Sequence, residues 1–383
     1  MAPNYHYAGF FLVAVMLVLP AAAERFEVWY PQYGQVFEIL MNTHCSSQLD
    51  DFRHGNASTV PLDFLGGGDE PSRLIQPLVL CILDNTPEYI KVAMSASQVL
   101  LGVTPTILSI LGASVEESAL LFIVGRRPVL AWLLALGSPS VYFNRAFEYR
   151  SPFEILQGHQ ERINIHRPRR TWAVAITVLE YILAALSMVN MGMQTWQLGL
   201  RTFCSVWPDS YFAPSLWVIL RIALHCISLL LVRLRIRRNF NGVEAGERMG
   251  FREWMRGVLG RVPVFDGFKS ATNMELSPCV MQKQADVETF GESKTYVCLA
   301  WLLHTLTVVH ILYGTLTFSS LSFIGTRDAI SVLGRFMASV LTCRVILMYE
   351  IAGLREAYLE NNGSTEVTMI TQVASTKSQP GLW

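Results

Sequence analysis

Charged residues are scarce in this chain of 383 residues. Asp, Glu, Lys and Arg make up 16% of it, against about 25% in a typical soluble domain. Hydrophobic residues make up 51%, and the mean hydropathy is +0.34. This balance excludes an ordinary soluble domain and predicts a protein that is largely embedded in a lipid bilayer.

Motifs of several enzyme classes are also missing. The sequence has no GxSxG nucleophile elbow, HExxH helix, GxxxxGK phosphate loop, dinucleotide-binding glycine fingerprint or Asp-rich diphosphate site. Its seven cysteines include no CxxC pair and no zinc-finger spacing. The sequence therefore predicts no catalytic residue, no metal and no cofactor. A nucleic-acid partner is not expected either, because membrane orientation accounts for the basic segments.

What the chain does have is a set of long apolar stretches. The first, 87–112, follows Thr86, a residue type that often caps helices, and contains Pro105, which predicts a kink. Each further stretch is also long enough to cross the ~30 Å hydrocarbon core as a helix. They are 172–194, 213–234, 296–318 and 329–351. We expect an all-α membrane protein, a helical bundle of about five to six transmembrane helices.

The first 23 residues are typical of a signal peptide. Phe10 to Leu19 is an apolar run of ten residues, and Ala21-Ala22-Ala23 matches an A-x-A cleavage pattern. No Lys or Arg precedes the run, so an uncleaved signal anchor is the alternative.

Residues 24–86 would then form a small exoplasmic head. Asn56-Ala57-Ser58 is an N-glycosylation sequon on that side of the membrane. Cys45 and Cys81 either pair in a disulfide there or stay free.

Basic residues set the predicted orientation. Segment 145–171 is rich in arginine, and the stretch 213–234 ends among Arg233, Arg235, Arg237 and Arg238. The positive-inside rule places 145–171, 235–295 and the carboxyl-terminal tail 352–383 in the cytoplasm, and the nearly uncharged 195–212 outside. The tail is rich in Ser, Thr and Gln, so we expect it to be disordered.

Segment 113–144 is too short to cross in the usual way. A capping box at Ser114 and Glu117 predicts a short helix, and an apolar run of less than a full span follows Pro128. Both flanks of 128–144 are basic, which favours a re-entrant or interfacial hairpin. A short true span is the alternative, and it would require another segment to be oriented differently.

The predicted inner loop contains one amphipathic helix, 247–262. Trp254 lies on its apolar face, while Arg248, Arg252 and Arg256 fall mainly away from that face. Such a helix fits the surface of an anionic inner leaflet. Packing against the ends of the crossings would produce the same pattern.

Ionisable residues inside the apolar stretches are candidate functional residues, because hydrocarbon makes them costly. Counted from the cytoplasmic ends, several fall at roughly 10–14 Å depth. The candidates are Glu180, Arg221, His225, His304 and Arg344. A single polar cluster of these residues would relay protons, bind an anionic head group or hold a metal. Simple ion pairs and hydrogen bonds between helices are the alternative.

Some stretches resemble a known group of proteins. They are CILDNTPE (81–88), QVLLGVTPT (98–106), GRRP (125–128) and GSP (137–139). They resemble uncharacterised multi-pass integral membrane proteins of filamentous fungi, mainly over residues 80–235. The resemblance implies a eukaryotic secretory-pathway membrane and no known activity.

Three functions are compatible with this sequence. The first is a non-enzymatic receptor- or scaffold-like protein of the plasma membrane or the endomembrane system. The second is a small-solute or ion transporter that uses the intramembrane polar cluster. The third is a membrane-embedded enzyme acting on a lipid or terpenoid, accessory to a metabolic pathway. Dry packing around the cluster would favour the first, and a wet cavity the second.

Overall fold

A computed structural model of the chain describes a helical protein. The described residues are 26–55, 72–142, 155–156, 168–208, 210–238, 275–281, 287–289 and 293–377. The predicted signal peptide, the sequon at Asn56, and the helix 247–262 with Arg248, Arg252, Trp254 and Arg256 lie outside them.

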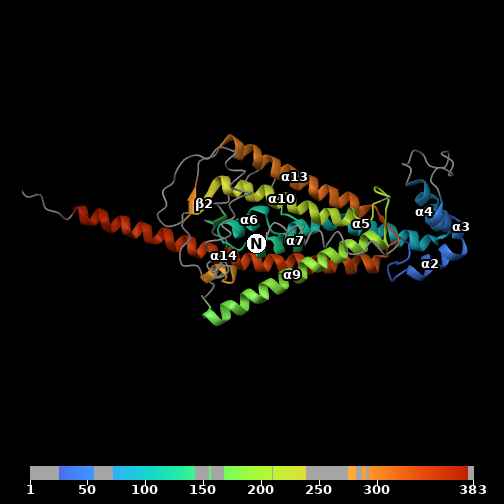
Figure 1. The fold of residues 1–383 in the computed structure, drawn as a ribbon, viewed down its shortest axis with the longest axis horizontal. Coiled ribbons are helices and arrows are strands. Elements are labelled where there is room, and N and C mark those ends of the chain that lie inside the picture. Colours follow the sequence, from blue (N-terminus) through green and yellow to red (C-terminus); the bar gives the residue numbers. More distant parts are fainter. Residues whose placement is uncertain are drawn as a thin grey trace, which may run out of the picture.

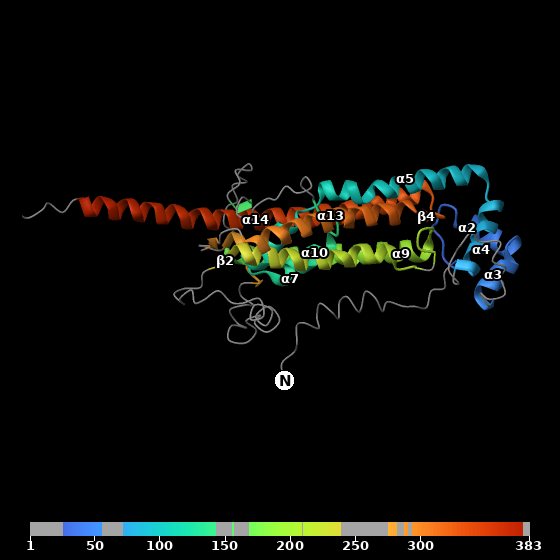
Figure 2. The ribbon, with the colours of Figure 1, turned by 90° about the horizontal axis from the view of Figure 1, so that it is seen from above.

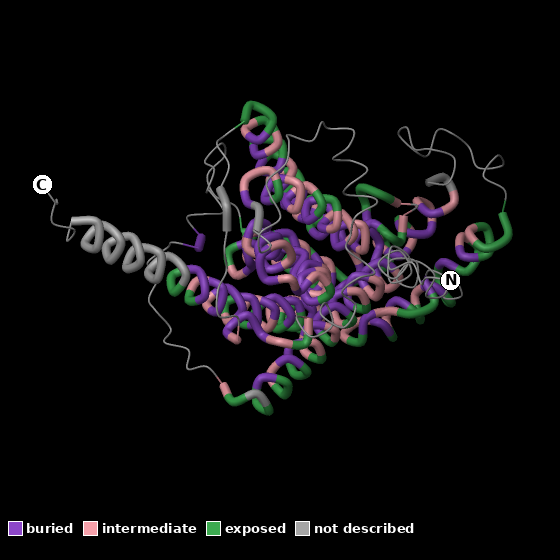
Figure 3. Tube along the Cα trace, turned by 60° about the vertical axis from the view of Figure 1, so that its left-hand side comes forward, coloured by how far each residue is buried: buried purple, intermediate pink, exposed green. Residues whose placement is uncertain are grey.

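Five helices among the described residues are long and apolar enough to cross a membrane. These helices are α5 (Glu88–Leu111), α9 (Arg170–Arg201), α10 (Ala213–Arg235), α13 (Lys294–Ser319) and α14 (Thr326–Lys377). They pack side by side along one long axis, with buried residues facing inward (Figures 1 and 3). Outward-facing apolar side chains such as Val92 and Val99, both 68% exposed, suit contact with lipid. The predicted all-α bundle is confirmed.

Two short antiparallel pairs tie the loops at opposite ends of the bundle. At one end, β1 (Phe203–Cys204), which follows α9, pairs with β4 (Leu321–Ser322), which follows α13. At the other end, β2 (Ile236–Arg238) after α10 pairs with β3 (Val287–Thr289) before α13. Successive long helices from α9 onward therefore run in alternating directions.

Small residues let the central helices approach each other closely. A Cβ added at Gly102 of α5 would lie 2.8 Å from the Cβ of Ser319 on α13. A Cβ added at Gly314 of α13 would lie 2.6 Å from the indole nitrogen of Trp217 on α10. Close backbone approach at glycine is a common way of packing helices where lipid supplies no hydrophobic drive.

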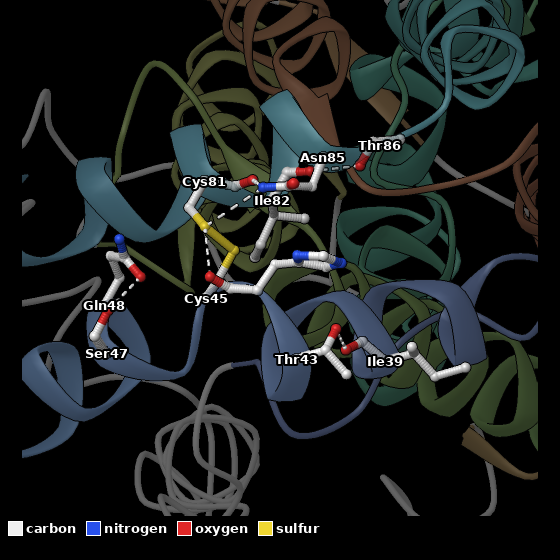
Figure 4. The surroundings of a disulfide bond; sticks show 10 residues. Ile39, Thr43, Cys45, Ser47, Gln48, Cys81, Ile82, Asn85 and Thr86 are labelled. Carbon is white, nitrogen blue, oxygen red and sulfur yellow. Dashed lines mark hydrogen bonds between the residues drawn. A yellow bond between two sulfur atoms is a disulfide. The ribbon is translucent and has the colours of Figure 1, made fainter.

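The head is a set of three short helices beyond one end of the bundle (Figure 2). These are α2 (Gly34–Thr43), α3 (Ser46–His54) and α4 (Ser72–Asn85). Cys45 and Cys81 form a disulfide that joins the α2–α3 junction to α4 (Figure 4). The Thr86 hydroxyl donates to the Ile82 carbonyl at 2.6 Å, so Thr86 does not cap α5, whose N-cap is Pro87.

The head shares its core with the loops of the bundle. The rings of Trp29, Phe37 and Phe323 pack with centroids 5.2–5.4 Å apart, and Phe203 is buried in the same core. Phe323 follows β4 and has a φ of 67°, a left-handed backbone that bulky residues rarely adopt. Its buried ring holds this conformation, so the α13–α14 turn is part of the head.

Between α5 and α9 the chain forms a helical hairpin. It contains α6 (Val115–Ile123) and α7 (Pro128–Gly137), which pack on each other and on α9, α10 and α14. The backbone N–H of Tyr142 donates to the Ala113 carbonyl at 3.1 Å, so the two ends of the hairpin meet. A hairpin that enters and leaves a membrane on one face has this geometry; its placement in a membrane stays a prediction.

Two element boundaries differ from the prediction. Helix α9 continues to Arg201 instead of ending at Gln194, and Leu198 in this extension is buried in the core of the bundle. Helix α14 continues to Lys377, so the expected disorder from residue 352 is wrong over 352–377. Leu354, Ala357 and Tyr358 are buried in the core with α6 and α7, and this packing stabilises the extension.

The disulfide generates a prediction for the stability of the head. Replacing Cys45 and Cys81 together by serine should destabilise the protein by roughly 2–5 kcal/mol, the usual cost of losing a native disulfide. The measurement is the rate of limited proteolysis in the head, together with the thermal unfolding of the full chain in detergent. Cys226→Ser is the matched control, because Cys226 is a free, exposed cysteine. An unchanged rate of cleavage would contradict the prediction.

Candidate functional site

The α6–α7 hairpin brings buried charges together from several helices at the end of the bundle away from the head. Arg127, just before α7, is fully buried. Its Nη1 lies 2.7 Å from Glu180 Oε2 on α9 and 2.7 Å from Glu350 Oε1 on α14. Its Nε donates to the Glu275 carbonyl at 3.2 Å. We call Arg127, Glu180, Glu275 and Glu350 the Arg127 cluster.

The carboxylate of Glu275 has its own donors. Glu275 Oε1 accepts the backbone N–H groups of Val129 at 3.0 Å and Leu130 at 3.4 Å, at the positive end of α7. It also accepts the Tyr181 hydroxyl at 2.5 Å. Burial raises the pKa of the Glu275 carboxyl, and these hydrogen bonds oppose the rise. Burial also raises the pKa of the Cys279 thiol close by.

The segment 275–281 closes the cluster from the side. It contains the short 3-10 helix η3 (Cys279–Met281). The backbone N–H of Cys279 donates to Glu350 Oε2 at 3.2 Å. A Cβ added at Gly353 on α14 would lie 2.4 Å from the backbone nitrogen of Val280. Helix α14 and this segment are therefore in direct contact at Glu350 and at Gly353.

A second group lies between α6, α10 and α13. Ser118 Oγ is 3.3 Å from His225 Nδ1 and 3.5 Å from Arg221 Nη2. Glu116 Oε1 is 3.9 Å from His304 Nε2. We call these five residues the Arg221 cluster; none is more than 8% exposed. Arg221 Nε and Nη1, and His225 Nε2, have no hydrogen-bond partner among the described residues.

Glu117 links the hairpin to α14 in a third place. It completes the predicted capping box with Ser114 at the start of α6. Its Oε2 also forms an ion pair with Arg344 of α14. One carboxylate therefore both caps a helix and pairs with a charge on a neighbouring helix.

His310 lies outside these clusters and connects α13 to α10. Its Nε2 is 2.8 Å from the Trp217 carbonyl of α10, and its ring stacks on the Trp217 indole at 5.6 Å. This is an ordinary hydrogen bond between helices.

The five residues predicted to form one cluster are divided among the three groups. Glu180 belongs to the Arg127 cluster, and Arg344 pairs with Glu117. Arg221, His225 and His304 belong to the Arg221 cluster. Equal depth along separate helices does not make side chains meet, because the direction in which each side chain points also matters.

Sequence reasoning missed the partners of these residues. Glu116, Glu117 and Arg127 lie in the hairpin, and the sequence identifies only Glu117, as part of a capping box. Glu350 is the second-last residue of the predicted 329–351 span. The sequence contains one pointer to these partners: acidic residues that lie next to apolar runs. Each such acid needs a partner once it is buried.

No metal site is evident in the part of the chain that the structure describes. Within it, no three His, Cys, Asp or Glu side chains are placed to hold a metal ion. The arrangement offers carboxylates, guanidinium groups and imidazoles, and carboxylates and imidazoles can hold or pass protons.

Loss of Arg127 should destabilise the protein strongly. Arg127→Gln leaves Glu180 and Glu350 buried without their cation, and removing one partner of a buried ion pair costs roughly 3–5 kcal/mol. The measurement is the free energy of unfolding of the full chain in detergent. Lys91→Gln is the control: Lys91 pairs with Glu88, which is 86% exposed, and such pairs contribute about 0–1 kcal/mol. Equal losses in the two variants would refute this assignment.

Comparison of the chain with known protein families, characterised proteins and solved structures finds no match. The resemblance to fungal membrane proteins therefore stays a prediction. The geometry supports a multi-span membrane protein with buried, paired charges at one end and a disulfide-braced head at the other.

Proposed function

We propose that this is a receptor- or scaffold-like integral membrane protein of the plasma membrane or of a secretory-pathway membrane. In this proposal its head faces the exoplasm and its C-terminus the cytoplasm. The observation that carries the proposal is a direct connection between the head and the first turn of α14. The Gln32 backbone N–H donates to Asp328 Oδ2 at 3.0 Å, and the Arg327 N–H donates to Gln32 Oε1 at 2.9 Å.

This connection makes the head and α14 one mechanical unit. Gln32 satisfies one of the free N–H groups at the start of α14, as a cap does. Phe323 packs in the head core just before that helix. A ligand or partner that shifted the head would move the start of α14. The other end of this helix extends beyond the neighbouring helices on the far side of the bundle (Figure 1).

Burial of the polar groups also favours this function over transport. Arg127, His225 and Glu350 have no measurable exposure. A permeation path needs such residues to face water at some stage, whereas a structural bundle buries them. Orientation follows from the arginine-rich segments, by the positive-inside rule. An anionic inner leaflet is a partner compatible with this orientation.

Uncoupling the head should loosen the start of α14. Gln32→Ala removes the side-chain acceptor of the Arg327 N–H, and Asp328→Ala removes the acceptor of the Gln32 backbone N–H. In the double variant, amide hydrogen exchange in residues 327–332 should therefore become several-fold faster. Exchange in the middle of α10 should not change. Gln35→Ala is the matched control, since Gln35 is an exposed glutamine a few residues away. Unchanged exchange at the start of α14 would mean that the head is not coupled to it.

A transporter is the second candidate, because the Arg221 cluster contains buried donors without described partners. The two functions differ in a flux assay. With the full chain in liposomes that contain a pH-sensitive dye, we expect an imposed proton gradient to decay as slowly as in empty liposomes. Faster decay that His225→Ala abolishes would reject the scaffold function in favour of transport.

A further inference from the structure

The Arg127 cluster contains more negative charge than positive charge. Among the described residues, Glu180 and Glu350 contact a single guanidinium group, and the three side chains are 0–6% exposed. The third acid, Glu275, is stabilised separately by Tyr181 and by the start of α7. With both Glu180 and Glu350 ionised, the site would carry an uncompensated buried charge, which is very costly.

The two carboxylates are also close to each other. Glu180 Oε2 and Glu350 Oε1 each lie 2.7 Å from the same nitrogen atom, so these oxygens cannot be further apart than twice that distance. Glu180 Oε1 has no hydrogen-bond partner among the described residues, although Glu180 is only 5% exposed. Two carboxylates held this close do not both ionise easily, because each disfavours the charge on the other.

The missing positive charge can be a proton or a metal cation. A metal cation requires several oxygen or nitrogen ligands around one point. The described residues provide no such group of three His, Cys, Asp or Glu side chains. A proton requires only a lone pair on one of the two carboxylates, which both provide.

We propose that Glu180 and Glu350 share one bound proton, which makes the Arg127 cluster a proton-binding site between α9, α14 and the tip of the hairpin. The protonated carboxyl and the carboxylate together balance the charge of one arginine. The titratable groups that face this pair come from all the elements around it. They are Arg127, Tyr181, Glu275, Cys279 and Tyr349.

Proton release would weaken the contacts at this end of the bundle. Loss of the proton leaves two carboxylates repelling each other across the interface of α9 and α14. Because the folded chain holds the proton and an exposed glutamate releases it near pH 4.3, raising the pH through the release point lowers the stability of the fold. The proposed receptor or scaffold would thus respond to a rise in pH.

The test is infrared spectroscopy of the full chain in lipid, which detects the carbonyl stretch of a protonated carboxyl group. The wild type should show a band that Glu180→Gln removes. Glu350→Gln should remove the same band, because each single variant leaves one carboxylate, fully ionised, for one arginine. Glu117→Gln is the matched control: Glu117 already has Arg344 to itself, so the band should stay. Glu116→Gln identifies any band that comes from the Arg221 cluster.

Stability measurements complete the test. The thermal midpoint of the wild type should fall as the pH is raised, and that of either single variant should fall less over the same range. The double variant should be less stable than both, because it leaves Arg127 without either of the two carboxylates that contact it. A band that persists in both single variants would overturn the proposal. So would a stabilisation by Na⁺, at constant ionic strength and pH, that both variants lose, since it would assign the site to a metal cation.

Discussion

The contact of Arg127 with Glu180 and Glu350 is the constraint on which the end of the bundle away from the head depends. It connects the tip of the hairpin to α9 and α14 at a single nitrogen atom. Apolar side chains of the same size would fill this space equally well, so a buried ion pair is weak evidence for added stability. The contact favours the observed register of the hairpin, which brings the guanidinium between both carboxylates. The same guanidinium group also binds the segment 275–281, because Arg127 Nε donates a hydrogen bond to the Glu275 carbonyl.

The two ends of the bundle are held by different kinds of contact. At the head end, aromatic rings, a disulfide and the hydrogen bonds of Gln32 join segments that are far apart in sequence. In the middle, Gly102 and Gly314 let helices touch along their backbones. At the opposite end, charges buried in and around the hairpin replace these contacts. The contacts at the head end are therefore mainly apolar, and those at the opposite end are mainly electrostatic.

The number and type of crossing helices could be predicted from the sequence, because hydrophobic stretches are a direct consequence of bilayer thickness. Their ends could not. Helix α9 continues past Gln194 and α14 continues past Ile351, and neither extension contains a helix-breaking proline. In α14, Leu354 and Tyr358 are also buried in a hydrophobic core. Charged residues in the spans could be found, but not their partners. Arg127 and Glu117 lie in the hairpin, and nothing in the sequence says that it folds back between α9, α10 and α14.

The hydrogen bond between Arg327 and Gln32 joins residues 295 positions apart. During synthesis on the ribosome, Gln32 emerges long before the helix that it caps. At about 5–20 residues per second, the interval is roughly 15–60 s. The disulfide, with a separation of 36 residues, can close early in that time, but the aromatic core must wait for Phe323. The head is thus among the first parts of this protein to be translated and the last to mature, because its aromatic core stays incomplete until Phe323 has been made.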